Sequence, residues 1–164
     1  MSIGEKIRWL FVGGGVVRLN RKASDAFNNE KFEEALRLLL RAERKYPLYE
    51  VTYHNLGNVF LALHKDVDAE KAFRKAFKLK PTFVEAMNDL AAMLVKKGRR
   101  DEAEAILRKA IEINPKYPYA RVNLGRLLID KGSFTEAETE WKTALESKDL
   151  DATTKKSIEE QLAL

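Results

Sequence analysis

Few side chains in this sequence have the type and spacing that catalysis or metal binding requires. The two histidines, His54 and His64, are ten residues apart, so they do not share the i, i+4 face of a helical metal pair. Four serines show no nucleophile-elbow motif around them: Ser24, Ser133, Ser147 and Ser157. Cysteine is absent, which removes thiolate ligands, a Cys nucleophile and a disulfide framework. We therefore predict no catalytic residue, no metal site, no cofactor and no enzymatic activity.

The N-terminal residues 1–15 form an apolar segment ahead of the regular part of the chain. Its apolar residues fall on one helical face: Ile3, Ile7, Leu10 and Phe11, with Trp9 adding bulk. The apolar run at 9–12 is far too short to span a bilayer, and no small-residue cleavage site of a signal peptide follows it. We expect the glycines at positions 13–15 to end this helix. They form no phosphate loop, because no Gly-Lys-Ser/Thr follows.

The composition describes a soluble globular chain. With 45% hydrophobic and 34% charged residues among 164, it is too apolar for disorder and too charged for a membrane span. Residues 1–49 carry ten basic residues against six acids, and residues 118–164 carry seven against nine. Solvated helix faces account for this balance, and a head-to-tail electrostatic contact is the alternative. The basic residues are dispersed along the chain, which disfavours nucleic-acid binding despite a pI near 9.3.

A period of 34 residues organises most of the chain. It separates Pro47, Pro81 and Pro115. Two alanine columns keep the same step: Ala35, Ala69, Ala103 and Ala137 in one, and Ala42, Ala76, Ala110 and Ala144 in the other. A period of this length is typical of stacked supersecondary units. Apolar residues at spacings of three and four predict two antiparallel helices in each unit.

The second period resembles the tetratricopeptide repeat (TPR) family. The residues that carry the resemblance are Tyr53-x2-Leu56-Gly57-x2-Phe60, then Ala69-x3-Phe73, Ala76 and Pro81. The resemblance covers residues 16–151 and implies an all-α fold. It implies a right-handed α-solenoid of four helix-turn-helix units, 16–49, 50–83, 84–117 and 118–151, with a C-terminal capping helix over residues 152–164.

Local features are expected to shape these units. Gly57, Gly125 and Ala91 leave room where the two helices of a unit cross. Turns between helices are expected near His64, Gly98 and Gly132, where glycine can end a helix.

The first and last units depart from the pattern. Lys22 stands in the first unit where Leu56 stands in the second, and we expect it to weaken that helix as a core element. Asp151 is expected to cap the last helix, with Ile158 and Leu162 covering the end of the fourth unit.

In the TPR family, one side of the first helix of each unit lines a concave surface that binds extended peptides or partner helices. Transferring that side through the 34-residue register gives a candidate peptide-binding groove. Its residues are Asn20, Ser24, Phe27, Val51, His54, Asn55, Asn58, Leu61, Asn88, Ala92, Val95, Tyr119, Val122, Asn123, Arg126 and Ile129.

Two columns of this groove suit a peptide. One is apolar: Phe27, Leu61, Val95 and Ile129. The other supplies amides that donate to and accept from a peptide backbone: Asn55 and Asn123, with Asn58 and Asn88 nearby. The alternative is that part of the apolar column packs between neighbouring repeats.

One ligand class of the family is disfavoured. TPR domains that clamp a C-terminal carboxylate use a Lys and an Asn, then an Asn, then a Lys and an Arg. In register from the first unit the matching residues are Asn20, Ser24, Asn55, Glu85 and Asp89. Only Asn55 fits, and the two acids would repel a carboxylate.

The resemblance implies a non-enzymatic scaffold or adaptor for complex assembly, which binds a peptide or helix of a partner protein in the groove. One alternative is a membrane-surface assembly factor held weakly by residues 1–12, where Lys6 and Arg8 accompany the apolar face. Another is a homo-oligomer in which this segment occupies a groove. We expect the chain in the cytoplasm or on its membrane face.

Overall fold

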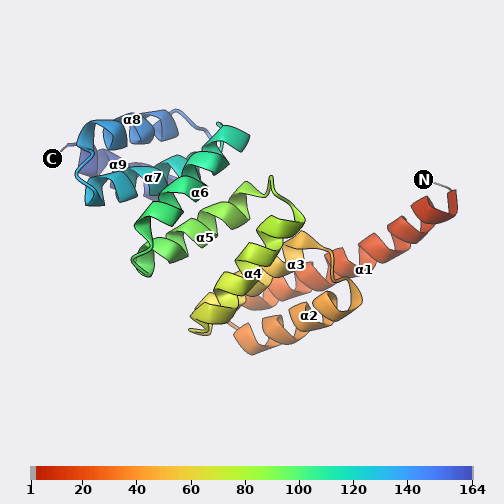
Figure 1. Ribbon diagram of the computed structural model, residues 1–164. Helices are drawn as coiled ribbons and strands as arrows, with labels where there is room; N and C mark the ends of the chain where they lie inside the picture. The colour runs from red at the N-terminus through yellow and green to blue at the C-terminus, as the bar shows by residue number, and fades with distance from the viewer. Residues whose placement is uncertain (1–2, 164) are drawn as a thin grey trace. The chain divides into compact units, whose positions relative to one another are not determined.

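The computed structural model describes the backbone of residues 3–163 and the side chains of residues 14–163. Within this range all regular structure is helical, so the all-α prediction is confirmed (Figure 1). The chain divides into two compact units, Met1–Pro81 and Thr82–Leu164. Unit 1 contains α1 (Ile3–Asn28), α2 (Phe32–Lys45), α3 (Glu50–Ala62) and α4 (Asp66–Leu79). Unit 2 contains α5 (Val84–Lys96), α6 (Arg100–Ile113), α7 (Pro118–Asp130), α8 (Phe134–Leu145) and α9 (Ala152–Leu162).

Sequential helices pack in pairs, α1 with α2 and α3 with α4 in unit 1, and α5 with α6 and α7 with α8 in unit 2. Glycine allows the close approach in two of these pairs. A Cβ atom at Gly57 would collide with the ring of Phe73, and one at Gly125 would collide with the indole of Trp141. The Trp141 indole nitrogen also donates a hydrogen bond to the Val122 carbonyl, at 3.1 Å. The predicted role of these two glycines at the helix crossings is confirmed.

The turn inside each pair uses one left-handed residue at a fixed repeat position. These residues are Glu30, His64, Gly98 and Gly132, with φ of 59°, 57°, 76° and 78°. In each turn the next backbone N–H donates to the carbonyl five residues earlier, at 2.8–2.9 Å. This bond closes the helix end in a Schellman motif. The predicted turns at His64, Gly98 and Gly132 are confirmed.

Helix α1 runs without a break through the glycines at positions 13–15, so the prediction that they end a helix is wrong. A Cβ atom at Gly15 would collide with the Tyr46 hydroxyl, which shows that this glycine admits the end of α2. A helical glycine costs only about 1 kcal/mol relative to alanine, and such packing can offset it. In the described part of the chain, no helix is both long and apolar enough to cross a bilayer.

Lys22 is exposed, so the expectation that it weakens a core helix is also wrong. Leu56, its equivalent one repeat later, is 2% exposed. Lys22 lies on the solvent-exposed face of α1, where its charge stays hydrated and has no desolvation cost. The repeat position therefore has two different environments in the two helices.

Helix α9 closes unit 2 as its residues predicted. The Asp151 carboxylate accepts hydrogen bonds from the Thr154 backbone N–H at 2.9 Å and from the Thr154 hydroxyl at 2.6 Å. Ile158 is 1% exposed and belongs to a buried cluster with Val122 and Trp141, and Leu162 packs against this cluster. The N-cap and the two apolar contacts of α9 are confirmed.

Candidate peptide-binding groove

Unit 1 has a hollow of about 230 Å³ between α1 and α3. Four of the predicted groove residues line it together: Ser24 and Phe27 from α1, and Asn55 and Asn58 from α3. Helical periodicity places them there, because positions 24 and 27 share one face of α1 and positions 55 and 58 share one face of α3. The hollow therefore combines an aromatic ring with a hydroxyl and two amides.

The remaining lining residues were not predicted. Ala23, Leu39 and Val59 supply apolar lining, and Asn28 supplies a third amide. Asn28 follows Ser24 by four residues, so helical spacing could have indicated it. Leu39 could not be found in this way, because it belongs to α2 and reaches the hollow only through tertiary packing.

Asn20 is 5% exposed and bonds within the unit. Its Nδ2 donates to the Val16 carbonyl at 3.0 Å and to the Thr52 hydroxyl at 2.8 Å. Its Oδ1 accepts from Asn55 Nδ2 at 3.0 Å. Asn20 therefore joins α1 to α3, and a ligand contact by its amide stays a prediction.

The other predicted residues of α3 are half-buried and lie outside the hollow lining: Val51, His54 and Leu61. The His54 ring centroid is 6.0 Å from that of Phe73, which belongs to the core of the α3–α4 pair. Phe27 makes an edge-to-face contact with Phe32, with ring centroids 5.4 Å apart. Phe27 therefore packs inside its own repeat, and packing of the apolar column between neighbouring repeats stays a prediction.

Unit 2 repeats the amide bridge of unit 1. Asn123 Nδ2 donates to Asn88 Oδ1 at 2.8 Å, and Asn88 Nδ2 donates to Asp89 Oδ1 at 3.3 Å. Asn88 is 7% exposed and Asn123 is half-buried. The bridge links α5 to α7 as the Asn20–Asn55 bridge links α1 to α3.

Three predicted groove residues of α7 take part in the C-terminal core instead of an open surface. Val122 is 2% exposed within the Trp141–Ile158 cluster, and Tyr119 and Ile129 pack against that cluster. The other predicted residues of unit 2 are Ala92 and Val95, which are half-buried, and Arg126, which is exposed.

The Tyr117 hydroxyl in unit 2 is influenced by two carboxylates of α5. Burial raises the pKa of the Tyr117 hydroxyl far above its ordinary value, and the carboxylates of Asp89 and Glu85 raise it further. Both effects disfavour the phenolate, so Tyr117 stays neutral. The same carboxylates oppose the approach of an anionic ligand.

The comparisons with known proteins agree on the fold. Two tetratricopeptide repeat family models match residues 54–118 and 94–153. The comparison with curated proteins gave no match.

Several solved structures share the fold at low sequence identity. YrrB, described as a TPR protein with an unusual peptide-binding site, aligns with a TM-score of 0.66 at 23% identity, covering 79% of this chain and 67% of that one. A structure of MamA aligns with a TM-score of 0.71 at 21% identity, covering 99% of this chain and 98% of that one. The first TPR of Spaghetti (RPAP3), bound to the HSP90 peptide SRMEEVD, aligns with a TM-score of 0.68 at 19% identity, covering 73% and 94%.

The 34-residue period, the paired helices with their glycine crossings and the two family matches lead to one conclusion: the chain belongs to the tetratricopeptide repeat family.

Proposed function

We propose that this chain is a non-enzymatic protein-interaction scaffold that holds an extended peptide of a partner protein against α1 and α3. The observation that carries this proposal is the hollow in unit 1, where Phe27 lies among the polar groups of Ser24, Asn55 and Asn58. An apolar side chain of the peptide would enter this hollow, and its backbone would bond to the amides.

The amides suit this role because each can donate and accept. Asn55 donates a hydrogen bond from its Nδ2 to Asn20 Oδ1. This bond fixes the orientation of the Asn55 amide and leaves the Asn55 Oδ1 to accept from a peptide N–H. Asn58 and Asn28 add two further amides around the same hollow. An extended peptide offers alternating N–H and C=O groups that such a set can pair.

Two relatives support the proposal by analogy. YrrB is described as having a peptide-binding site, and the RPAP3 repeat domain is bound to a peptide. The acidic side chains of Glu85 and Asp89 disfavour a peptide that binds through its C-terminal carboxylate, because they would repel its negative charge.

Both histidines have structural positions in unit 1. His64 occupies the left-handed turn position, where its backbone conformation serves the helix connection. His54 is half-buried beside the Phe73 ring. A homo-oligomer in which the N-terminal segment occupies a groove stays a prediction.

Selection of random linear peptides displayed on phage would test the proposal, with the affinity of an enriched peptide then measured by fluorescence anisotropy. The double substitution Phe27→Ser with Asn58→Ala should weaken binding by at least about 10-fold, because it removes an apolar contact and a hydrogen-bonding group. As a control, Phe134→Ser with Lys78→Ala changes two residues outside the hollow and should leave the affinity unchanged. Equal affinity of the wild-type protein and the groove variant would contradict the proposal.

A further inference from the structure

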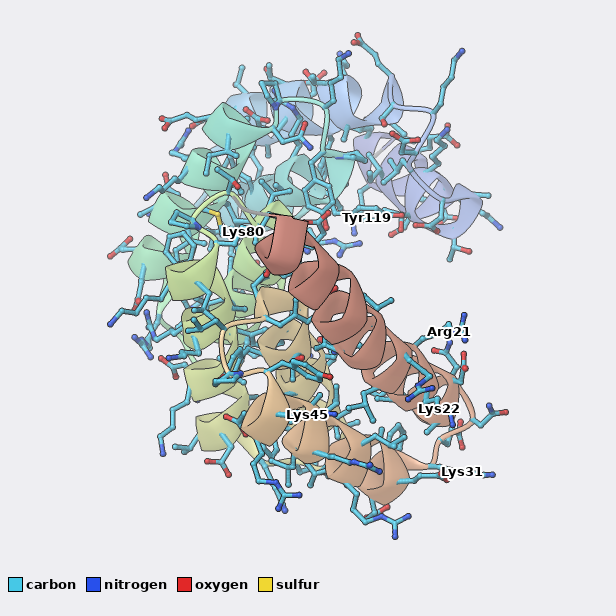
Figure 2. All side chains as sticks on the ribbon, turned by 90° about the vertical axis from the view of Figure 1, so that its right-hand side faces the viewer. Arg21, Lys22, Lys31, Lys45, Lys80 and Tyr119 are labelled. Atoms are coloured by element: carbon cyan, nitrogen blue, oxygen red, sulfur yellow. The ribbon has the colours of Figure 1, made fainter. Side chains whose placement is uncertain are left out.

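Five basic residues on α1 and α2 form a surface that the helix register defines. We call Arg18, Arg21 and Lys22 of α1, with Arg37 and Arg41 of α2, the α1–α2 basic face. All five side chains are exposed. In Figure 2, Arg21 and Lys22 project from the ribbon of unit 1, as does Lys31 from the start of α2.

The repeat shows which way the three residues of α1 face. One repeat later, Thr52, Asn55 and Leu56 hold the same positions on α3, and all three turn toward the preceding helix pair. Thr52 and Asn55 bond to Asn20 of α1, and Leu56 lines a depression shared with α2. Equivalent positions on α1 therefore turn away from α3, on the outer side of the unit.

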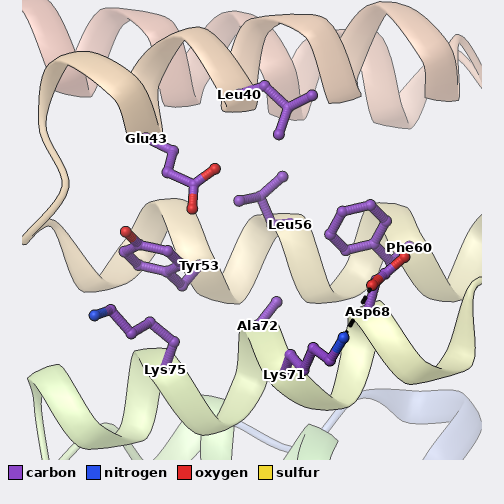
Figure 3. A pocket seen from close by; sticks show the side chains of 9 residues that line it. All are labelled: Leu40, Glu43, Tyr53, Leu56, Phe60, Asp68, Lys71, Ala72 and Lys75. Carbon is purple, nitrogen blue, oxygen red and sulfur yellow. Dashed lines mark ion pairs between the residues drawn. The ribbon is translucent and has the colours of Figure 1, made fainter.

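The same comparison holds for α2. Lys71 and Lys75 of α4 line the depression of about 360 Å³ that α4 shares with α2 and α3 (Figure 3). Their equivalents one repeat earlier are Arg37 and Arg41. These arginines consequently project from α2 on the side that bears the basic residues of α1. The two helices together present one surface.

The residues of the basic face differ from Lys71 and Lys75 of α4 in their contacts with other side chains. Lys71 lies 3.8 Å from the Asp68 carboxylate, and the Lys75 Nζ lies 5.7 Å from the centroid of the Tyr53 ring. In contrast, no acid in the described part of the chain forms an ion pair with any of the five bases. Three acids share the surface by register, Asp25, Glu33 and Glu34, so the five basic residues keep an excess of two positive charges.

The face also has an apolar side. Val17, on the exposed side of α1, is 52% exposed, and Leu19 and Leu38 are half-buried at register positions between the bases. Because α1 is one helix from Ile3, the helical period carries the line of Arg18 and Arg21 back to positions 3, 7, 10 and 11. In the sequence these positions are Ile3, Ile7, Leu10 and Phe11.

We propose that the α1–α2 basic face docks this protein on the surface of a bilayer that contains anionic lipids. Such a bilayer matches both parts of the surface, since its headgroups attract unpaired Lys and Arg and its interfacial region accepts apolar residues. A nucleic acid would match only the Lys and Arg residues of this surface and not its apolar residues. A second copy of the chain would need an acidic surface with apolar residues beside it. The proposal is independent of peptide binding by unit 1.

Co-sedimentation of the full chain with vesicles tests this docking. Vesicles of phosphatidylcholine are compared with vesicles in which about a third of the lipid is phosphatidylglycerol, at low and high salt. We expect the wild-type protein to pellet with the anionic vesicles and to be released by salt. The triple substitution R18E/R21E/K22E should lower the partition coefficient by about 100-fold or more, because each basic residue near the membrane contributes about a factor of five.

The matched control is K71E/K75E/K78E on α4, which changes the net charge equally. It should lower the partition coefficient by no more than about fivefold, since these lysines lie outside the basic face. Circular dichroism verifies that both triple variants keep their helices. If the face variant does not fold, L10S/F11S takes its place, and its binding to anionic vesicles should fall by at least about 10-fold.

Three results would overturn the proposal. One is equal pelleting with neutral and anionic vesicles. Another is equal binding by the face variant and the α4 control. The third is an absence of vesicle binding by the wild-type protein; if single-stranded RNA then binds and R18E/R21E/K22E abolishes this, the face belongs to a nucleic acid. If the same substitutions instead abolish self-association in analytical ultracentrifugation, it belongs to a second copy.

Discussion

Each helix turn contains one residue with left-handed backbone dihedral angles, and in two of the four turns this residue is not glycine. Gly98 and Gly132 adopt positive φ without a steric cost, whereas Glu30 and His64 place a Cβ atom in the same conformation. For a residue other than glycine the left-handed region costs roughly 1–2 kcal/mol. The Schellman bond nevertheless forms in all four turns, so the surrounding helix pair imposes this conformation.

A reciprocal pair of substitutions tests this strain. His64→Gly should raise the free energy of unfolding by about 0.5–1 kcal/mol, because relief of the steric cost exceeds the added freedom of glycine in the unfolded chain. Gly98→Ala should lower it by about 1 kcal/mol. Urea unfolding followed by circular dichroism measures both changes. A loss of stability in His64→Gly would show that the imidazole makes a contribution of its own.

Glycine at a helix crossing should respond differently from glycine on an open helix face. Gly57→Ala should destabilise the protein by about 1–3 kcal/mol, since the new methyl group overlaps the Phe73 ring. Gly14→Ala serves as the control, because a Cβ there meets nothing within 4 Å. It should stabilise the protein by up to about 1 kcal/mol, because α1 is continuous at this point. Thermal unfolding that shifts in the same direction for both variants would contradict this account.

At the scale of single elements, α9 is fixed at one end by its cap and in the middle by its apolar contact. Hydrogen bonds from the Thr154 hydroxyl and backbone N–H lower the pKa of Asp151 below its ordinary value. A carboxyl whose pKa is lower in the folded state contributes stability that is present above its unfolded pKa. This contribution is lost as the pH falls through the folded value.

The substitution Asp151→Asn removes this titration while keeping a side chain that can cap. The difference in stability between the wild-type protein and the variant should therefore shrink as the pH falls from about 5 to about 2. Thermal unfolding over this range, with the helical signal as the readout, measures the effect. Parallel pH profiles of the two proteins would exclude a contribution of the Asp151 carboxylate to acid sensitivity.

At the scale of the whole molecule, the two units have their own helix pairs and their own buried residues. In repeat proteins each element contacts mainly its sequence neighbours, so a local defect need not spread along the chain. Ile158 is well placed to test this, because it is 1% exposed in the cluster that holds α9 on unit 2.

Ile158→Ala should destabilise the region around α9 by about 2–4 kcal/mol, with Ile158→Val costing about 1 kcal/mol as the graded control. Hydrogen exchange measured by mass spectrometry should show faster exchange in α7, α8 and α9. Exchange in α1 and α2 should remain as in the wild-type protein. Equal loss of protection in both units would mean that the molecule unfolds as a single cooperative block.

The sequence by itself determined the helices from residue 16 onward, their pairing and the family. A 34-residue period with small residues at crossings constrains the backbone locally, and helical periodicity reports which residues share a face. That was sufficient to bring Ser24, Phe27, Asn55 and Asn58 to one hollow. It was also sufficient to place the cap of α9 at Asp151.

Only the tertiary structure decided which faces are covered. Asn20 and Asn58 are both amides on predicted groove faces, yet Asn20 is buried in a bridge to α3 and Asn58 lines the hollow. Gly15 lies inside a helix, where its missing Cβ atom leaves room for the Tyr46 hydroxyl, and Lys22 is exposed where Leu56 is buried. The physical reason is the same in each case. A residue's own sequence position fixes its direction on the helix, whereas its environment depends on what a distant part of the chain places opposite it.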